Sequence, residues 1–366
     1  MEQIALLQQL FFWSALTYWA AGFLLLWRIP SAADTPRLSE GRSSPSHQPV
    51  DESGESGRTH NPARELSIVI PARNEAENIG TLLTSIAKQQ VRPLEVIVVD
   101  DESEDGTYKI AEKFAITSTC TNVRVIKAGQ RPIGWTGKNW SCHCGAVQAK
   151  GRLVLFLDAD TRFERNDALL HLAEQHACWG GMISVQPYHR VQKIYEHMSG
   201  FFNLIVMVGS RAFDVWSTPG EADGCFGPCI LMDRTEYEAV GGHEAVKGQV
   251  VDDLALCALY RRNGLGVHCF GGRKLISFRM YPGGLLSLIE GWTKNMAVGA
   301  SLAKVRTVVL LVIWFTGISN AALALSTWAG AGMSSALTES SFFGDGRIVL
   351  LWTLLVAGIY ALYVLQ

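Results

Sequence analysis

The sequence predicts a doubly wound α/β domain combined with three membrane-spanning helices. Short β-branched runs alternate with segments of helical periodicity between residues 66 and 157, which is typical of a parallel sheet covered by helices on both faces. Acidic residues follow two of the strand-like runs. Three apolar runs, at residues 4–27, 305–329 and 348–366, have about the length that a bilayer requires.

The composition supports membrane segments and disfavours a nucleic-acid partner. With 48% hydrophobic and 18% charged residues, the 366-residue chain is more apolar than an average soluble domain. The formal net charge of −2 gives no electrostatic reason to expect nucleic-acid binding. The eight cysteines form no disulfide framework, so we expect them to be reduced. Cys142-His143-Cys144 lacks the spacing of zinc ligands, which disfavours a zinc site there.

The first apolar run, residues 4–27, contains no charge and is followed by Arg28. We expect a transmembrane helix, because a cleaved signal peptide would have a shorter apolar run, a basic start and a small-residue cleavage site. Arg28, Arg37 and Arg42 place the residues that follow in the cytoplasm by the positive-inside rule. Residues 28–64 are rich in Ser, Pro, Gly, Asp and Glu, which predicts a flexible linker.

The α/β domain is expected over residues 65–282, with a first half at 65–160 and a second at 161–282. Strand-like runs lie at residues 66–70, where Pro71 ends the run, and at 94–99, 123–126 and 153–157. Helical periodicity lies at residues 79–90, at 108–114 and after Lys138. Ligands bind beyond the carboxyl ends of the strands in such sheets, so the residues after each strand are candidates for a site.

Asp158-Ala159-Asp160 directly follows the fourth strand-like run. Two carboxylates at a strand end offer the oxygen ligands that Mg²⁺ or Mn²⁺ takes together with substrate phosphates. A solvated turn is the alternative, because Asp is common where strands stop. Asp100-Asp101-Glu102 follows the second strand-like run, and this recurrence favours a nucleotide cleft.

Several motifs together resemble the family 2 glycosyltransferases of the GT-A fold. These are Ile70-Pro71-Ala72-Arg73-Asn74-Glu75, Val98-Val99-Asp100-Asp101-Glu102-Ser103, Gly137-Lys138 and Asp158-Ala159-Asp160. Later motifs are similar to the membrane-bound diaponeurosporenoate glycosyltransferases of carotenoid biosynthesis and, more loosely, to hopanoid-associated and ceramide glycosyltransferases. They are Gln186-Pro187-Tyr188-His189, Gly241-Gly242-His243 and Glu290-Gly291-Trp292-Thr293-Lys294.

The resemblance implies a UDP-sugar as donor. In such enzymes the first strand end cradles the uridine, which corresponds here to Pro71, Ala72 and Glu75. The second strand end provides an Asp that accepts a hydrogen bond from the uracil imide, which corresponds to Asp101. A carboxylate suits a buried imide donor, because charge-assisted hydrogen bonds are the stronger ones.

The resemblance also implies a divalent metal, Mg²⁺ or Mn²⁺, near the diphosphate. Asp158 and Asp160 would take the ribose or the sugar and the metal, with Asp160 the more direct metal ligand. Lys138 would approach the diphosphate or the sugar, and a solvated loop lysine is its alternative.

The second half is expected to supply a catalytic base. Asp252 and Asp253 stand just before a helical pattern, and Asp252 could equally be a helix N-cap. By the resemblance, Asp253 matches the catalytic base, the second acid of a Glu-Asp motif in which Asp252 replaces the Glu. The base would take the acceptor proton during a single in-line displacement, which inverts the anomeric centre.

A membrane lipid is the expected acceptor. Residues 283–304 predict an amphipathic helix at the membrane interface, with a core-facing helix as the alternative. The spans at 305–329 and 348–366, with a loop at 330–347, would keep the catalytic domain on the cytoplasmic side of the cell membrane. A carotenoid acid would already be ionised at neutral pH, so the presence of Asp253 does not separate an acid acceptor from an alcohol.

Transfer of one sugar, expected to be glucose, is favoured. Trp292-Thr293-Lys294-Asn295 lacks the Gln-x-x-Arg-Trp pattern of processive synthases, and three predicted spans are too few to enclose a polymer channel. As a departure from the family's pattern, the sequence stops at Gln366, where the resembling proteins continue. Another lipid, such as a hopanoid or a ceramide-like molecule, or a soluble acceptor stays open. A non-catalytic nucleotide-binding membrane protein is disfavoured, because clustered carboxylates are costly and yet are retained here as Asp101, Asp158, Asp160 and Asp253.

Overall fold

The structure of the protein is a computed structural model. It describes residues 28–34, 62–118, 122–216, 222–302 and 305–316, together with residue 18 and residues 21–22 and 24–26. The chain divides into two compact units, Arg28–Leu302 on one side and Met1–Trp27 with Ala303–Gln366 on the other. The three predicted membrane spans fall largely outside the described residues. Within the described part, no helix combines the length and the apolarity needed to cross a membrane.

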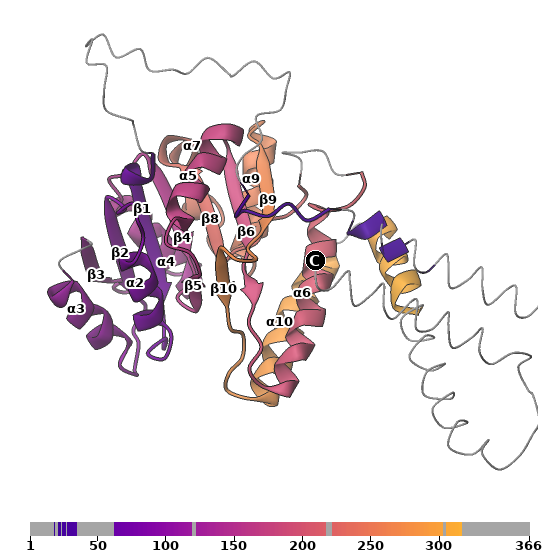
Figure 1. Cartoon of the computed structure of the whole chain (residues 1–366), viewed down its shortest axis with the longest axis horizontal. Coiled ribbons are helices and arrows are strands. Elements are labelled where there is room, and N and C mark those ends of the chain that lie inside the picture. The colour runs from indigo at the N-terminus through magenta and orange to yellow at the C-terminus, as the bar shows by residue number, and fades with distance from the viewer. Residues whose placement is uncertain are drawn as a thin grey trace, which may run out of the picture. The chain divides into compact units, whose positions relative to one another are not determined.

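The larger unit is built on a seven-stranded sheet with the order β3-β2-β1-β4-β8-β6-β9 (Figure 1). The strands are β1 Leu66–Ala72, β2 Glu95–Asp100, β3 Val123–Lys127, β4 Leu153–Leu157, β6 Met182–Gln186, β8 Cys229–Asp233 and β9 Val267–Gly271. The first four run parallel, as predicted. The complete sheet is mixed, because β8, which lies outside the segments where strands were predicted, runs antiparallel to both β4 and β6.

The reversal of β8 follows from how the chain enters it. Pro228, just before β8, accepts a hydrogen bond from the backbone N–H of Asp158, just after β4, at 3.0 Å. The chain therefore enters β8 at the edge where β4 ends, and it can only run back alongside. A second difference lies in β1, which continues through Pro71 to Ala72 and pairs there with β2. Proline is tolerated at this strand end even though it donates no hydrogen bond.

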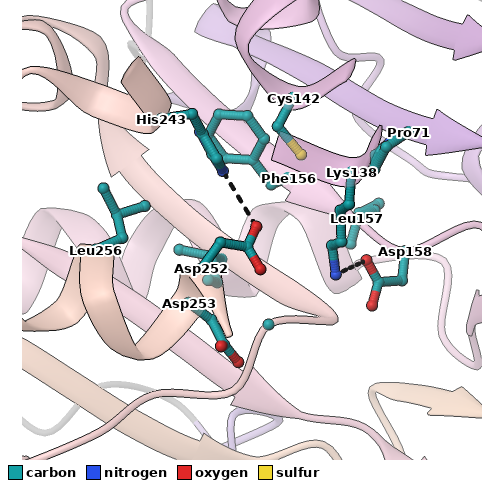
Figure 2. Close-up of a pocket in the computed structure, with 12 residues that line it drawn as sticks. Pro71, Lys138, Cys142, Phe156, Leu157, Asp158, His243, Asp252, Asp253 and Leu256 are labelled. Carbon is teal, nitrogen blue, oxygen red and sulfur yellow. Dashed lines mark ion pairs between the residues drawn. The ribbon is translucent and has the colours of Figure 1, made fainter. Parts of the chain in front are cut away.

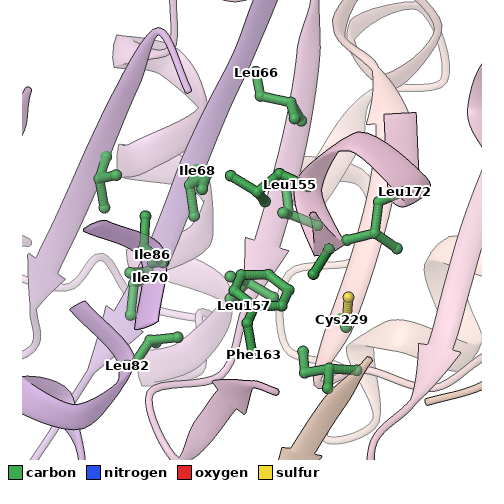
Figure 3. Packing of buried hydrophobic residues seen from close by; sticks show 14 of the residues in the cluster. Leu66, Ile68, Ile70, Leu82, Ile86, Leu155, Leu157, Phe163, Leu172 and Cys229 are labelled. Atoms are coloured by element: carbon green, nitrogen blue, oxygen red, sulfur yellow. The ribbon is translucent and has the colours of Figure 1, made fainter. Parts of the chain in front are cut away.

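Helices cover both faces of the sheet, which confirms the doubly wound α/β class. On one face α2 Ile79–Ala87, α3 Thr107–Thr117 and α5 Ala168–Trp179 pack over the main apolar core, which includes Leu66, Ile68 and Ile70 of β1 (Figure 3). On the other face lies α4 Gly137–Gln148, where the Cα of Gly145 packs so closely that any side chain would overlap Val69. Alternate residues of β1 thus serve the two layers.

A small sheet and a helix pair complete this unit. The sheet has the order β5-β10-β7, with β5 Thr161–Phe163, β10 Ile276–Phe278 and β7 Tyr188–His189. The other helices are η1 Pro62–Glu65, η2 Ile194–Glu196, α6 His197–Ser210, α7 Arg234–Ala239, α8 Gly242–Ala245, α9 Asp252–Arg262 and α10 Leu285–Leu302. Helices α6 and α10 pack side by side, since Trp292 stacks on Phe202 and donates its indole N–H to Ser199 Oγ at 3.0 Å.

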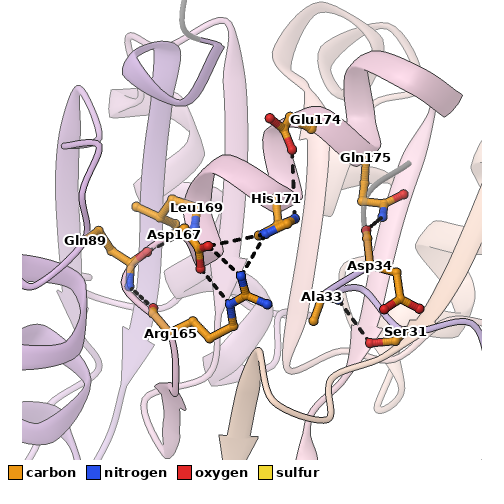
Figure 4. Close-up of polar contacts among 10 residues, drawn as sticks. All are labelled: Ser31, Ala33, Asp34, Gln89, Arg165, Asp167, Leu169, His171, Glu174 and Gln175. Carbon is orange, nitrogen blue, oxygen red and sulfur yellow. Dashed lines mark hydrogen bonds and ion pairs between the residues drawn. The ribbon is translucent and has the colours of Figure 1, made fainter. Parts of the chain in front are cut away.

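The segment predicted as a linker, residues 28–64, is described only at its two ends. Its first residues lie along β9, where Ala32 is fully buried and donates its backbone N–H to the carbonyl of Gly271 at 2.9 Å. The side-chain amide of Gln175 on α5 donates to the carbonyl of Asp34 at 3.0 Å (Figure 4). These contacts fasten the start of the segment to the sheet and to α5.

Candidate active site

The loops after β1 and β2 are joined by hydrogen bonds at the carboxyl edge of the sheet. The backbone N–H of Asn74 donates to Ser103 Oγ at 3.1 Å, and that of Glu75 donates to Thr107 Oγ1 at 2.7 Å. Asn74 adopts the left-handed conformation, with a φ of 57°. Asn favours this conformation more than most side chains do, so the sequence suits the tight turn. The two loops form one rim, which holds Glu75 in place.

Asp101 lies in this rim, 7% exposed, and its backbone N–H donates to the carbonyl of Ala72 at 2.9 Å. Arg73 Nη1 lies 3.4 Å from its Oδ2 atom. The carboxylate also lies against Gly137, the first residue of α4, where any side chain would overlap it. The N-terminus of a helix favours a negative charge, so the start of α4 is a suitable place for this carboxylate.

A pocket opens beside this rim, at the carboxyl ends of β1 and β4 and the start of α9 (Figure 2). It is lined by Pro71, Lys138, Cys142, Phe156, Leu157, Asp158, Gly227, Ile230, His243, Asp252, Asp253 and Leu256. Five residues that the sequence analysis selected are in this lining: Pro71, Lys138, Asp158, Asp252 and Asp253. The other four do not line the pocket: Ala72 is the last residue of β1, and Glu75, Asp101 and Asp160 lie in the adjoining loops.

Lys138 and Asp158 form an ion pair inside the pocket, with Lys138 Nζ 2.6 Å from Asp158 Oδ1. Desolvation lowers the pKa of Lys138, but the charges of Asp158 and Asp252 outweigh it, and the pKa lies well above its usual value. The lysine therefore stays protonated at any physiological pH. It stands on the first turn of α4, beside the capping residue Thr136, and not in a solvated loop.

The carboxylates beside this ion pair repel one another. Desolvation raises the pKa of Asp160 to about 8, and the charges of Asp158 and Glu75 add to the rise. Desolvation also raises the pKa of Glu75, against the lowering effect of its hydrogen bond from Asn78. Within the described residues, no three side chains of the metal-binding kinds are arranged as a complete metal site. The acids provide part of a cation site at most.

Asp252 and Asp253 are the first two residues of α9, and the first turn of this helix faces the pocket. Val251 occupies the N-cap position, so the N-cap alternative for Asp252 is wrong. Desolvation raises the pKa of Asp253 to about 6, with a further contribution from the charge of Asp252. The carboxylate of Asp253 lies against the Cα of Gly227, where an added Cβ would be only 2.9 Å from Oδ2.

His243 also lines the pocket, and the sequence analysis assigned it no role. Its Nε2 atom lies 3.7 Å from Asp252 Oδ2 (Figure 2). Its Nδ1 atom lies 2.8 Å from the hydroxyl of Tyr237. Desolvation lowers the pKa of His243 to about 3, and the charge of Lys138 adds to this effect, so the imidazole is neutral. The signal that could have found it was the Gly241-Gly242-His243 motif.

Comparison with known proteins identifies the family. The model of glycosyl transferase family 2 matches residues 67–235. The 4,4'-diaponeurosporenoate glycosyltransferase of Staphylococcus haemolyticus is 36% identical over 267 residues, which are 72% of this chain and 70% of that protein. The chain belongs to the family 2 glycosyltransferases. A protein of the same name from Staphylococcus aureus is 37% identical over 257 residues, which are 69% of this chain and 66% of that one.

The fold of this family 2 glycosyltransferase is also found among solved structures. A mannosyltransferase from Pyrobaculum calidifontis, in complex with GDP-Man and Mn²⁺, aligns with a TM-score of 0.50 and 18% identity. The alignment covers 97% of this chain and 94% of that chain. At this identity the likeness concerns the fold alone, and it confirms the GT-A fold that the sequence motifs implied.

Proposed function

We propose that this glycosyltransferase moves one sugar from a UDP-sugar to a membrane lipid, with inversion at the anomeric carbon. One observation carries the proposal: the Lys138–Asp158 ion pair and the acids Asp252 and Asp253 line the same pocket. The pocket thus contains both the ammonium group of Lys138, which can bind a diphosphate, and carboxylates that can accept a proton from the acceptor. A single displacement requires both.

The donor is proposed to be a UDP-sugar because of the rim formed by the loops after β1 and β2. Asp101 offers a carboxylate for the uracil imide N–H, and a charge-assisted hydrogen bond of this kind selects for the base. Pro71, Ala72 and Glu75 stand at the neighbouring strand end and would surround the uridine. A guanine base also presents ring N–H donors, so a GDP-sugar is the comparison to make.

The acids in and beside the pocket fit a divalent cation. Asp158 and Asp160 offer hard oxygen ligands. Desolvation, with a further contribution from the charges of Asp158 and Glu75, raises the pKa of Asp160, and a bound cation would favour its ionised form. Substrate phosphate oxygens would complete the ligand set, as they do in many Mg²⁺ and Mn²⁺ sites. When bound, such an ion stabilises the negative charge that develops on the departing diphosphate.

The protein itself supplies a fixed charge and a base. Lys138 would contact the diphosphate as a permanently charged donor. Asp253 would accept the proton of an acceptor hydroxyl while its oxygen attacks the anomeric carbon from the face opposite the diphosphate. A pKa of about 6 leaves most Asp253 side chains ionised at neutral pH and still basic enough to take a proton. An ionised carboxylic acid acceptor would attack without this help.

The lipid acceptor is proposed because of the surface of the α6–α10 helix pair. Leu288 and Trp292 on α10 are buried, while Leu286 on the same helix is 76% exposed. Further exposed apolar side chains on η2, α6 and α10 are Ile194, Met198, Leu285 and Ile289. A helix pair with an apolar outer surface suits contact with a bilayer. We place this surface at the cytoplasmic side of the cell membrane.

The acceptor class follows from the same surface and from the relatives. The two staphylococcal relatives are named for 4,4'-diaponeurosporenoate, a carotenoid acid, which makes a carotenoid acid or alcohol the first acceptor to test. A hopanoid, a ceramide-like lipid and a soluble sugar are the alternatives.

The test is a transfer assay with the full chain in nanodiscs. Radiolabelled UDP-glucose, UDP-galactose and GDP-mannose are supplied in turn with Mn²⁺ and a carotenoid acid or alcohol. We expect label from UDP-glucose to enter the lipid phase, and an Asp253→Asn variant to transfer far less to the alcohol. Label on a soluble sugar alone would refute the lipid acceptor. UDP binding without transfer to any acceptor would refute the enzymatic proposal.

A further inference from the structure

Tyr237 and His243 form a buried pair on the helices α7 and α8, in which His243 lines the pocket and Tyr237 does not. Their side chains are about 5% and 4% exposed. The backbone N–H of His243 donates to the hydroxyl oxygen of Tyr237 at 3.0 Å. The same hydroxyl lies 2.8 Å from Nδ1 of the His243 ring. One tyrosine hydroxyl thus contacts both the backbone and the ring of the same histidine.

These two contacts determine which ring nitrogen carries the proton. A buried hydroxyl needs an acceptor for its single proton. Among the described residues, Nδ1 of His243 is the acceptor within hydrogen-bond distance of Tyr237. Nδ1 is then unprotonated, and the neutral imidazole carries its proton on Nε2. Nε2 is the atom that lies 3.7 Å from Asp252 Oδ2.

The glycine before His243 makes this arrangement possible. Gly242 has a φ of 49°, in the left-handed region, and the ring of Tyr237 lies directly against its Cα. An added Cβ would overlap the ring and lie 2.8 Å from the hydroxyl oxygen. Only glycine at position 242 leaves room for the Tyr237 ring, whose hydroxyl contacts His243. This gives the Gly241-Gly242-His243 motif a physical role.

We propose that His243 is a positioning residue for Asp252, and that Tyr237 fixes the tautomer in which His243 offers its Nε2–H to that carboxylate. This inference rests on the proposed function of the Asp252–Asp253 pair. Asp252 lies between the His243 ring on one side and the charge of Lys138 on the other. A separation of 3.7 Å is too long for a hydrogen bond, and contacts of this kind tighten when a substrate fills the site.

The orientation of Asp252 matters because its charge acts on Asp253. The negative charge of Asp252 contributes to the raised pKa of Asp253, and a raised pKa makes a stronger base. A donor on Nε2 would keep the Asp252 carboxylate ionised and turned toward the pocket. Losing that donor lets the carboxylate rotate. We therefore expect the loss to affect turnover and not the binding of the nucleotide.

The first test compares two buried tyrosines. Tyr237→Phe removes the hydroxyl that fixes the tautomer, and we expect kcat to fall about 10- to 100-fold with an unchanged KM for the UDP-sugar. Tyr260→Phe is the matched control, because Tyr260 is fully buried and its hydroxyl has no hydrogen-bond partner among the described residues. Its kcat should stay as in the wild type. Equal kcat values for the two variants would overturn the proposal.

The second test replaces His243 in two ways. The amide nitrogen of His243→Gln can occupy the place of Nε2, whereas that of His243→Asn is too short to reach Asp252. We expect the Gln variant to keep kcat within about fivefold of the wild type and the Asn variant to lose as much as Tyr237→Phe. If the two variants lose kcat equally while their melting temperatures match the wild type, His243 has only a packing role.

The third test needs no turnover. In the full chain with ¹⁵N-labelled histidine, NMR distinguishes the Nε2–H from the Nδ1–H tautomer, and the His243 signal is assigned by its loss in His243→Gln. We expect the Nε2–H form in the wild type and a mixture in Tyr237→Phe. An Nδ1–H form in the wild type would overturn the inference. If the chain transfers no sugar to lipid while the Nε2–H form is observed, only the proposed function fails.

Discussion

Nζ of Lys138 lies 2.6 Å from Oδ1 of Asp158, so the two groups expected to meet the donor diphosphate and its metal are partners of each other. The pair joins the first turn of α4 to the end of β4. In the proposed reaction, donor binding would exchange one set of charged contacts for another, with Lys138 contacting the diphosphate and Asp158 the cation. This limits the cost of holding an isolated charge in the pocket.

Removing the charge of Lys138 is expected to weaken nucleotide binding. A hydrogen bond to a charged group contributes about 1.5–3 kcal/mol, so Lys138→Met should bind UDP about 10- to 100-fold more weakly. Isothermal titration of UDP in the presence of Mn²⁺ measures this. Lys138→Arg should recover part of the affinity, and Lys113→Met, on the exposed face of α3, should leave it unchanged. Wild-type affinity in Lys138→Met would show that Lys138 does not contact the donor.

Asp253→Asn separates the two chemical classes of acceptor. With a hydroxylated lipid the variant lacks the base, and kcat should fall about 10²- to 10⁴-fold. With a carotenoid carboxylic acid, which is already ionised, we expect a loss below about tenfold. The two kcat ratios are measured with the same enzyme preparation, and UDP binding serves as the control. Equal, large losses with both acceptors would mean that Asp253 does more than accept a proton.

The pH dependence of turnover should report the same carboxylate. As the proposed base, Asp253 would work in its ionised form, and desolvation raises its pKa to about 6. With a hydroxylated acceptor, kcat should therefore be level above about pH 6 and fall about tenfold for each pH unit below it. Asp252→Asn removes a negative charge that raises this pKa, so the fall should begin at a lower pH. A profile that is flat down to pH 5 would exclude Asp253 as the base.

The outer surface of α10 is expected to serve the lipid and not the nucleotide. Leu286→Glu places a charge on a side chain that is 76% exposed. We expect the apparent KM for the lipid acceptor to rise several-fold, with UDP binding unchanged, because a charge opposes burial in the bilayer. Ile116→Glu on α3 is the matched control, since Ile116 is 79% exposed. An equal effect of the two variants would argue against a special role of α10.

The strands and the acids that follow them were predictable from the sequence because those signals are local. The run at 153–157 coincides with β4, whose five residues are all buried. The predicted end of the first strand, at Ile70, is too early. Pro71 ends the apolar run, yet it still belongs to β1 and pairs with β2. The composition of the predicted linker also gave no sign of the contacts at its start, where Ala32 is fully buried beside β9.

Contacts between distant segments were not predictable. Nothing in the sequence indicates that β8 reverses direction, or that Gly227 approaches Asp253 closely. The same holds for Tyr237 and His243, whose contact depends on a left-handed glycine between two short helices. The pocket combines residues from β1, α4, the end of β4 and α9, and only the resemblance to a known family suggested that they act together.

The most direct test of the central claim is the configuration of the product. In the proposed single displacement, Asp253 directs the acceptor to the face of the sugar opposite the departing diphosphate. With UDP-α-glucose and a hydroxylated lipid, proton NMR of the purified glycolipid should give the large coupling constant of a β-linked anomeric proton. An α-linked product would contradict the single displacement and the role assigned to Asp253.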